Sequence, residues 1–424
     1  MSRSEELNKI IALCDYAVSA DDTRADWSLD FALFGFALSR LDEYIKEDRY
    51  FIFLKSFCDR FAAEKPLLGS REAAAPVLVV LEMYKRTKNE AYLSLAASVM
   101  NAVKKIHEED FESKPKRSAD GDFSRFESAD RDNADRNNKD FEPNFRERDR
   151  DNKNFEPNFR TAERDNKNFE SKPPRKTEGG FSSLKTADII SFLLADYMFL
   201  KYTGDADGLD VLVKKPKKYT ASLMDKKDNL FHRSFFRSRI FQNAKIHFPP
   251  GRNYPARENV LALFALTLIA EGEDYIHRDI NETIIRLTTA INNYRNVDGS
   301  YNAFFGNKRK SRSTGFITGK PADDGFDVSS FDPSVASYYA ACCLKNASAG
   351  IVDAGYLETG KNAYMTAANS LVKERGAVYL PSMCKKNFFQ GFLRLFSGFF
   401  SGGSNLSGIA GIVFAALEYE RQNF

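Results

Sequence analysis

The sequence has 424 residues, 43% hydrophobic and 29% charged, and its 62 Lys and Arg nearly balance its 59 Asp and Glu. This balance argues against a basic surface for nucleic acid and against attraction to an anionic membrane, so we expect neither as a partner. A chain of this length forms two or three ordinary domains, or one large single-layer architecture such as a barrel.

We expect no export signal. Its start, "MSRSEELNKIIALCDYAVSADD", has two acidic residues before a short amphipathic run and lacks the basic region and apolar block of a secretory signal. Even the apolar run "IISFLLADYMFL" is interrupted by Asp196, well short of the roughly 18 apolar residues of a membrane span. The cysteines contain no CxxC pair and read as buried free thiols of a reducing, cytoplasmic compartment: Cys14, Cys58, Cys342, Cys343 and Cys384.

Most of the chain has the apolar spacing of helices. Apolar residues recur three and four positions apart, with breaks at Gly, Pro, Asp and Asn. This pattern predicts twelve helices, at about 4–20, 28–46, 48–64, 72–86, 90–106, 184–203, 206–225, 256–272, 278–295, 332–350, 358–373 and 404–420. The stretch "GAVYLPSM" (376–383) is a candidate strand in a hairpin, and we expect the rest to be loop.

Twelve helices with short links predict six antiparallel hairpins. The phrases "MYKRTKNEAYLSLA" and "LKYTGDADGLDVLV" both end a helix with Thr, turn on polar residues and begin the next helix, which is typical of helical repeats. An open solenoid needs polar capping helices, but the last helix, "LSGIAGIVFAALEYE", is apolar on most sides. If the six hairpins close into a ring, the first hairpin covers this last helix. We therefore expect an all-α, (α/α)6 six-hairpin barrel that forms a single domain over 1–424.

A low-complexity insertion, 109–172, falls between the fifth and sixth helices. Five of its phenylalanines recur at intervals of 15, 15, 14 and 14, at Phe111, Phe126, Phe141, Phe155 and Phe169. From Glu109 to Glu178 the only aliphatic side chains are alanines, so the segment cannot bury enough area to order itself. We expect a disordered or loosely packed surface loop. The alternative is a charged tether for a partner or a polymer.

In such a ring the even-numbered helices all begin at one end. Helix starts bring amide donors and partial positive charge, which suit an anionic ligand. Unusual phrases stand at these starts: "RADWSLD" with the only Trp, "GSREAAAP", "KTADIISF", "NYPARENV", "FDVSSFDPSVAS" and "SGGSNLSG". A carboxylate beside an aromatic ring and an arginine in a concave opening predicts an acid/base site for a sugar acid.

Each of these residues also has a structural interpretation. Asp, Ser and Glu near helix starts are ordinary caps. Trp27 is then a core anchor, Arg257 an ion-pair partner and His232 a surface histidine. Other chemistries lack support, because HExxH, P-loop, GxGxxG and GxSxG motifs are absent and the four histidines lack metal-ligand spacing. We expect no metal and no cofactor. The aromatic run "NFFQGFLRLFSGFF" (387–400) is expected to be a loop over the barrel end, with a membrane or sugar contact as the alternative.

At these motifs the sequence resembles the unsaturated uronyl hydrolases of glycoside hydrolase families 88 and 105. The shared order covers nearly the whole chain outside the insertion: "DWSLDFALFGFALSRL", "PPRKTEGGF", "KYTGD", "DNLFH", "ARENVLALFAL", "NYRNVDGSY", "DPSVASYYAACCLKNASAGIVD" and "GIAGIVFAALE". The resemblance implies an (α/α)6 barrel that acts on an oligosaccharide with an unsaturated uronic acid end, the product of a polysaccharide lyase.

The resemblance also implies a mechanism without a metal. An aspartic acid protonates C4 of the vinyl ether while water adds at C5, and the hemiketal then collapses and expels the neighbouring sugar. It assigns Asp188 as the acid/base and Glu72 as the second carboxylate. It assigns substrate binding to Trp27, Arg257, Asn259, His232 and Asp332.

The sequence departs from the family pattern within this site. An ungapped match places the family acid on Ala187, so Asp188 corresponds after a one-residue shift, and His232 needs a similar shift. The family phrase Arg-Gly-Asn-Gly-Trp stands here as "RENVL", which keeps Arg257 and Asn259 and loses the glycines and the aromatic residue. Two other functions therefore stay open. One is an inactive barrel that binds a sugar acid or a partner, and the other is a sugar epimerase, for which two or more histidines at the opening are expected.

Overall fold

The computed structural model describes residues 4–19, 25–66, 68, 71–112, 181–238, 245–248, 253–271, 278–306, 332–374, 377–379 and 406–423. All of them belong to one compact unit, 1–112 with 180–424, while 113–179 is a separate unit. The expected insertion therefore lies outside the described residues, except for 109–112, which end a helix. Cys384 and the aromatic run 387–400 also lie outside them.

The described part of the chain is mainly helical. Its helices are α1 (Glu5–Ser19), α2 (Leu29–Ile45), α3 (Phe51–Glu64), the short 3-10 helix η1 (Arg71–Ala74), α4 (Val77–Thr87), α5 (Glu90–Glu112), α6 (Thr186–Thr203), α7 (Ala206–Leu212), α8 (Lys215–Leu223), α9 (Ala256–Glu271), α10 (Arg278–Asn292), α11 (Pro333–Ser348), α12 (Gly355–Asn369) and α14 (Leu406–Asn423). Its strands are β1 (Phe181–Lys185), β2 (Ser234–Ser238), β3 (Lys245–Phe248), β4 (Asn253–Pro255), β5 (Phe304–Gly306), β6 (Val372–Glu374) and β7 (Ala377–Tyr379).

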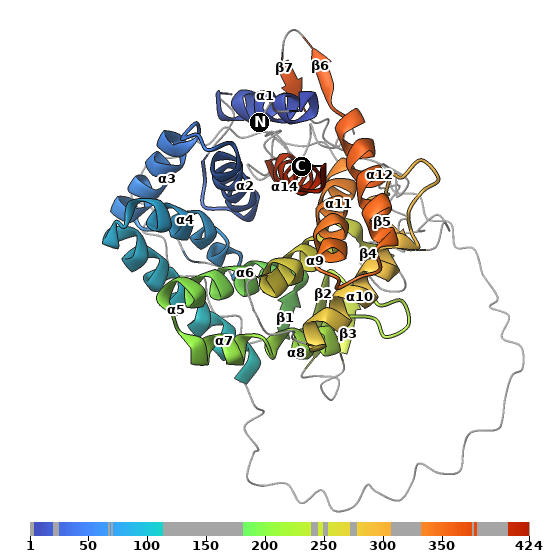
Figure 1. Ribbon diagram of the computed structural model, residues 1–424. Coiled ribbons are helices and arrows are strands. Elements are labelled where there is room, and N and C mark those ends of the chain that lie inside the picture. The colour runs from blue at the N-terminus through green and yellow to red at the C-terminus, as the bar shows by residue number, and fades with distance from the viewer. Residues whose placement is uncertain are drawn as a thin grey trace, which may run out of the picture. The chain divides into compact units, whose positions relative to one another are not determined.

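Six helices form a closed inner ring (Figure 1). In the order α2, α4, α6, α9, α11, α14 each helix packs against the next, and α14 packs back against α2. The other helices lie outside this ring, so the chain alternates between an outer and an inner helix. The second helix of each predicted hairpin is the inner one. The all-α six-hairpin architecture expected from the sequence is confirmed.

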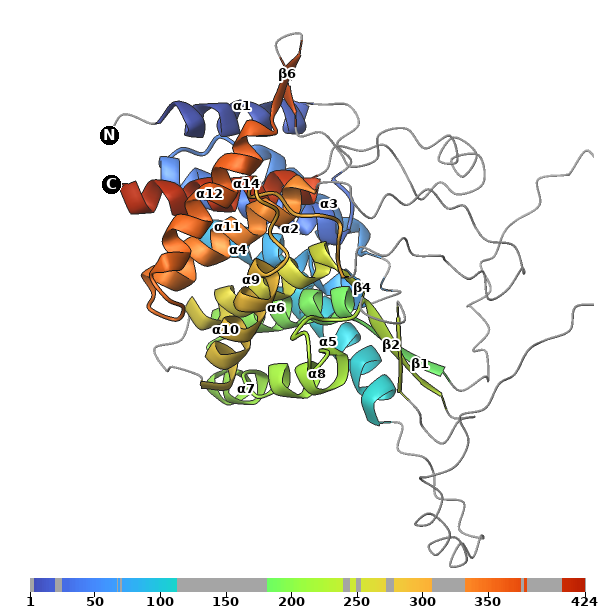
Figure 2. The ribbon, with the colours of Figure 1, turned by 90° about the vertical axis from the view of Figure 1, so that its right-hand side faces the viewer.

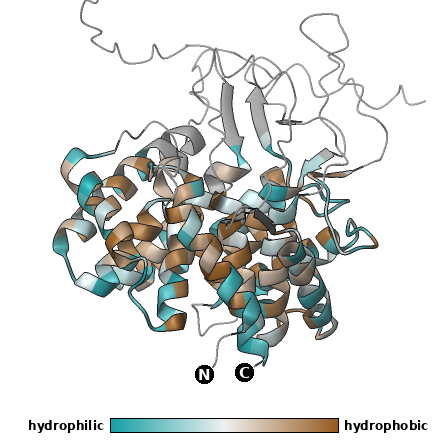
Figure 3. Ribbon diagram, turned by 90° about the horizontal axis from the view of Figure 1, so that it is seen from above, coloured by the Kyte–Doolittle hydropathy of each residue, from teal (hydrophilic) through white to brown (hydrophobic). Residues whose placement is uncertain are grey.

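The last helix shows why the ring closes. Every residue of α14 from Leu406 to Leu417 is buried, against α11 on one side and α2 on the other. Inside the ring, the Phe414 ring lies 4.7 Å from Phe264 of α9 and 5.6 Å from Phe36 of α2, centroid to centroid. Figure 3 shows apolar residues running along the helices and polar residues at their ends and turns. Burial of these apolar faces is the main force that holds the ring together.

Several helix boundaries differ from expectation, and proline is involved in two of them. The segment predicted at 206–225 is two helices, because α7 ends before a turn and α8 restarts with Pro216 in its first turn. The segment predicted at 72–86 begins later, since α4 starts at Val77, directly after Pro76. Glu72 therefore lies in the preceding η1 and not in a long helix.

The strands were only partly predicted. The hairpin at "GAVYLPSM" is confirmed over β7, which pairs antiparallel with β6. The prediction of loop elsewhere is wrong for the β1–β2–β3 sheet and for the β4–β5 pair. These strands are short, and β1 pairs with a segment about fifty residues away, so no local alternation reveals them. β1 leads directly into α6 and β4 directly into α9.

The four cysteines in the described residues are free and buried: Cys14, Cys58, Cys342 and Cys343. Burial raises the pKa of the Cys342 thiol to about 12. None of the described helices combines the length and the apolar character that a membrane crossing requires.

A buried carboxylate ties three helices together. Asp196 of α6 is 1% exposed. Its Oδ1 lies 2.8 Å from Nζ of Lys104 on α5, and its Oδ2 lies 3.1 Å from Nζ of Lys215 on α8. Both lysines are also partly buried against aromatic rings. The Asp196 carboxylate thus links the inner helix α6 to two outer elements.

We expect Asp196→Asn to lower the free energy of unfolding by about 2 kcal/mol. Removal of one partner of a buried ion pair costs about 3–5 kcal/mol, and the partial exposure of both lysines reduces this loss. Chemical denaturation measures the effect. Asp210→Asn, on the exposed surface of α7, is the matched control and should change little. Equal stabilities for the two variants would show that the Asp196 carboxylate does not stabilise the fold.

Candidate functional site

The inner helices all begin at one end of the ring, which we call the mouth. Figure 2 shows strands β1 and β2 on the side where α6 begins, and the end of α14 on the opposite side. Two of the polar residues at the mouth are helix caps. Ser28 caps α2 by accepting a hydrogen bond from the Phe31 amide at 3.3 Å, and Asp332 caps α11 by accepting one from the Ser334 amide at 2.9 Å. Both caps anchor the helix starts that surround the mouth.

Trp27 connects the start of α2 to η1. Its ring is half-buried, stacks on Phe57 and packs edge-on against Phe61, which supports its role as a core anchor. Its Nε1 donates a hydrogen bond to the carbonyl oxygen of Ala73 at 2.8 Å. Ala73 follows Glu72 in η1, so Trp27 holds the backbone beside the expected second carboxylate.

The two expected catalytic carboxylates lie on neighbouring elements. η1, which carries Glu72, packs against α6, and Asp188 is the third residue of α6. Both backbone positions are thus at the mouth. The side chains of Glu72 and Asp188 are outside the described residues.

An ion pair spans the mouth. Arg257 is the second residue of α9 and bonds through its guanidinium to the carboxylate of Asp30, the second residue of α2. Since α2 and α9 stand opposite each other in the ring, this contact crosses its diameter. Burial alone would lower the pKa of Arg257, but the charges of Asp30 and Asp332 outweigh it and raise that pKa. Both carboxylates therefore lie within electrostatic range of the guanidinium.

Asp30 was not predicted. It ends the unusual phrase "RADWSLD", but an acidic residue in the first turn of a helix is common, so Asp30 itself was not singled out. Only its proximity to Arg257, 227 positions away in sequence, distinguishes it. Arg257, in turn, is an ion-pair partner as the structural interpretation expected, and its side chain still keeps 35% exposure.

Asn259 acts through the backbone. Its side chain has 0% exposure, so it cannot contact a sugar directly, and the expectation of substrate contact does not fit its position. Its Oδ1 accepts a hydrogen bond from the Phe231 amide at 2.7 Å, and its Nδ2 donates to the carbonyl oxygens of Phe231 and Pro255 at 3.0 and 2.8 Å. Asn259 thus clamps the segment that carries His232 to the start of α9.

His232 is buried, with 6% exposure, so the interpretation as a surface histidine is wrong. Its carbonyl oxygen accepts a hydrogen bond from Oγ1 of Thr186, the first residue of α6, at 2.5 Å. Its Nε2 lies 3.8 Å from an oxygen of Asp225, and its ring centroid lies 5.0 Å from that of Tyr254. His232 therefore lies between the starts of α6 and α9. Its contact residue on α6, Thr186, is two positions before Asp188 in the sequence.

Asp225 is held in its charged form. Burial would raise its pKa, but hydrogen bonds from the amides of Asp228 and Lys227 and the charge of His232 keep that pKa below its ordinary value of 3.8. A carboxyl group with a lowered folded pKa stabilises the fold above its unfolded pKa. That stabilisation is lost as the pH falls through the folded pKa.

We therefore expect Asp225→Asn to destabilise the protein at neutral pH and less so in acid. At about pH 6 the unsubstituted chain has the full contribution of the carboxylate. It loses this contribution as the pH falls through the folded pKa, which lies below 3.8, while the variant has none to lose. Free energies of unfolding for both proteins from about pH 6 down through the acidic range test this. A constant difference between them would contradict a role for the charge of Asp225.

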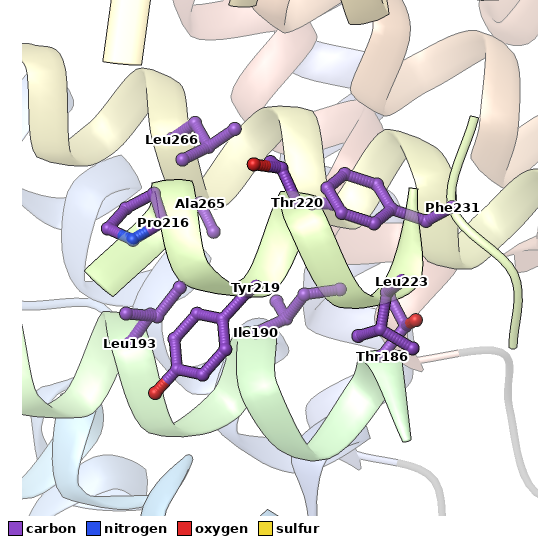
Figure 4. A pocket seen from close by; sticks show the side chains of 11 residues that line it. Thr186, Ile190, Leu193, Pro216, Tyr219, Thr220, Leu223, Phe231, Ala265 and Leu266 are labelled. Carbon is purple, nitrogen blue, oxygen red and sulfur yellow. The ribbon is translucent and has the colours of Figure 1, made fainter. Parts of the chain in front are cut away.

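Two hollows among the described residues are poor candidates for a sugar site. Figure 4 shows an apolar gap of about 30 Å³ between α6, α8 and α9, lined by Tyr219, Leu223 and their neighbours. That volume is close to one water molecule, too small for a sugar. A larger hollow of about 230 Å³ lies near the ends of α2 and α4, away from the mouth, and its charged residues pair with one another. Among the described residues no group of three or more His, Cys, Asp or Glu is placed to hold a metal ion.

Most of the expected site residues lie at the mouth. The starts of the inner helices, or the segments joined to them, carry Trp27, Arg257, His232 and Asp332 and the backbones of Glu72 and Asp188. Asn259 holds the segment before His232 through hydrogen bonds to its backbone. A guanidinium within electrostatic range of two carboxylates can bind a polar ligand, and a buried histidine held near the same helix starts can take part in proton transfer.

Comparison with solved structures identifies similar folds. A possible member of the GH105 family from Salmonella enterica has a TM-score of 0.64 at 13% identity, with 100% of this chain and 96% of that chain covered. One from Klebsiella pneumoniae has a TM-score of 0.63 at 12% identity, with 100% and 95% covered. An unsaturated glucuronyl hydrolase from a Bacillus species, responsible for the degradation of glycosaminoglycan, has a TM-score of 0.57 at 13% identity, with 99% and 96% covered.

The sequence itself matches no protein-family model and no curated protein. At such low identities the structural matches establish the fold alone. The resemblance seen in the motifs is thus confirmed as a shared architecture over the length of the chain.

Proposed function

We propose that this chain is a glycoside hydrolase that acts on oligosaccharides with an unsaturated uronic acid end, by hydration of the C4=C5 double bond. The observation that carries the proposal is the convergence of Arg257, His232 and the Asp188 and Glu72 backbones on one mouth. Neighbours of the same fold include unsaturated glucuronyl hydrolases. We further propose a cytoplasmic location, in keeping with the free cysteines, and a loop insertion that follows the end of α5 at Glu112 and extends to 172.

In the proposed reaction Asp188 donates its carboxyl proton to C4. A water molecule adds its oxygen to C5 and returns a proton to the Asp188 carboxylate, so that the acid is regenerated. The hemiketal at C5 then opens to a ketone. This leaves a hemiacetal at C1, which releases the neighbouring sugar as an alcohol. No redox partner is needed, because the net change is the addition of water across the double bond and cleavage of the glycosidic bond.

Each described residue has a place in this proposal. Arg257, whose ion pair with Asp30 crosses the ring, would bind the uronate carboxylate. Trp27 fixes η1, and hence the position of Glu72. His232 and Asn259 fix the start of α6, and hence the position of Asp188. Asp332 contributes charge near Arg257 and caps α11.

The direct test is a spectroscopic assay. Unsaturated disaccharides from pectin, rhamnogalacturonan and glycosaminoglycan lyases absorb in the ultraviolet because their double bond is conjugated with the carboxylate. Hydration removes this absorbance, so the purified protein should bleach at least one of these substrates. Bleaching of none of them at high protein concentration would rule out the hydrolase.

One observation favours a second function, an inactive barrel that binds a sugar acid. Asp30 already pairs with Arg257, and Asp332 lies near it, so the guanidinium is partly neutralised in the described structure. Such a site can retain a ligand without catalysing its hydration. Saturable binding of galacturonate by a protein that bleaches no unsaturated disaccharide would support this second function.

A further inference from the structure

A charged hollow lies away from the mouth, at the other end of the inner helices. It has a volume of about 230 Å³ and is formed by the C-terminal parts of α2 and α4 and by the turn after α2. These two helices are neighbours in the inner ring (Figure 1). Asp42, in the lining, is twelve residues beyond Asp30 on α2, which is about 18 Å along the helix axis. A cavity of about 150 Å³ can hold benzene, so the hollow has room for a small organic molecule.

Three buried polar residues line this hollow, and two of them have an oxygen without a partner. Ser39, Asp42 and Glu82 have 3%, 2% and 2% exposure. No hydrogen bond joins the Ser39 hydroxyl to another described residue. Oε1 of Glu82 accepts a hydrogen bond from Tyr202 at 3.1 Å and lies 3.2 Å from Arg40, while Oε2 accepts none from the described part of the chain. Neither Oγ of Ser39 nor Oε2 of Glu82 is completely buried, so both reach the open space of the hollow.

The lining has an excess of negative charge. Five of its residues are acidic and three are basic. Arg86 lies 3.1 Å from Asp42, and Lys85 lies 3.3 Å from Glu43, so part of this charge is neutralised within the lining. Arg40 adds one positive charge from outside the lining, and the sum stays negative. The ends of α2 and α4 add the partial negative charge of helix C-termini. The hollow therefore favours a cation over an anion.

The Asp42 carboxylate is not fully compensated by its partners. Burial raises its pKa above the ordinary value of 3.8, although hydrogen bonds from Arg86 and from the Tyr50 amide act in the opposite direction. A raised pKa means that the surroundings disfavour the charged form of the carboxyl group. A further cation in the hollow would stabilise that charged form.

We propose that the hollow binds a small aliphatic amine through its ammonium group. An ammonium group has three N–H donors, and Oγ of Ser39, Oε2 of Glu82 and the carboxylate of Asp42 are the acceptors that receive them. The alkyl chain occupies the remaining volume. A metal ion fits less well, because among the described residues no group of three or more His, Cys, Asp or Glu is placed to hold one.

Three four-carbon compounds test the charge preference: 1,4-diaminobutane, 1,4-butanediol and succinate. They have similar length but carry positive, no and negative charge at neutral pH, where an aliphatic amine is protonated. Isothermal titration calorimetry measures their affinities for the full chain at about 0.15 M salt, which screens attraction to the outer surface. We expect the diamine to bind at least tenfold more tightly than the diol, and succinate not to bind in the hollow.

We expect Ser39→Ala to weaken binding of the diamine roughly tenfold, because a hydrogen bond to a charged group is lost. Glu82→Gln should weaken it further, since it removes a charge as well. The stability of Ser39→Ala should stay equal or rise, because the hydroxyl removed has no partner among the described residues. Thermal unfolding of this variant separates a loss of binding from misfolding.

Ser337→Ala is the matched control. Ser337 has 0% exposure, and its hydroxyl donates to the carbonyl oxygen of Pro333 at 2.8 Å. It is on α11, which is not next to α2 or α4 in the ring, so its replacement should leave the diamine affinity unchanged. Three results would overturn the inference: equal diamine affinity of Ser39→Ala and the unsubstituted chain, equal affinity for diamine and diol, or no saturable binding of the diamine. In the last case the hollow holds water alone.

The amine site and the hydrolase activity are independent. Binding of the diamine that depends on Ser39 supports the amine site even if no disaccharide is bleached. Bleaching by a protein that does not bind the diamine supports the hydrolase and shows that the amine site is wrong.

Discussion

Replacement of Asp188 by Asn is expected to reduce bleaching of the unsaturated disaccharide by about 10³-fold, with the fold intact. General acid/base catalysis contributes about 10²–10⁴-fold, and an amide at this position cannot deliver a proton to C4. Asp188 is in the first turn of α6, joined to His232 through Thr186, and η1 packs against the same helix. The initial rate of absorbance loss at saturating substrate is the measurement, with galacturonate binding as a check that the mouth is intact.

Asp210→Asn is the control for this experiment, because it makes the same chemical change on the exposed surface of α7. It should keep full activity. Retained activity in Asp188→Asn would move the proton donor elsewhere, and Glu72→Gln would then be the next variant to measure. Loss of activity in both Asp188→Asn and Glu72→Gln would indicate that the two carboxylates act together.

The second large effect is on stability. We expect Asn259→Ala to lower the free energy of unfolding by about 3–4 kcal/mol, because it removes three hydrogen bonds and leaves buried backbone groups of Phe231 and Pro255 without partners. Each such group costs about 1–3 kcal/mol. Chemical denaturation at neutral pH measures the change. Bleaching activity should fall as well, since Phe231 precedes His232.

Asn362→Ala is the control for Asn259. Asn362 is on α12, and its amide reaches only the exposed Glu358 of the same helix, at 3.2 Å. Its replacement should change stability by less than about 0.5 kcal/mol. If Asn259→Ala were no more destabilising than Asn362→Ala, the clamp would not be a determinant of the site.

The departures of the site from the family pattern now have a structural context. The phrase "RENVL" keeps an arginine that points into the mouth and an asparagine that faces the protein interior. Arg257 and Asn259 are only two positions apart in the sequence. They nevertheless have different roles, because residues two apart on a helix face in different directions. Sequence reasoning treated them as one binding pair, and only the burial of Asn259 separates them.

The pairing of Asp30 was beyond prediction, although its phrase "RADWSLD" was noted. Asp30 reads as a first-turn acid. Its significance depends on which helices stand opposite each other in the closed ring. No periodicity along the chain reports that neighbourhood.

The sequence by itself determined the helices, the six hairpins and the need to cover α14, because helical periodicity and apolar surface are properties of residues within a few turns of one another. Only the tertiary structure decided that Arg257 pairs with Asp30, that Asn259 is a clamp and that His232 is buried. Burial and hydrogen bonding of a side chain depend on residues brought close by ring closure, many of them hundreds of positions apart in the chain.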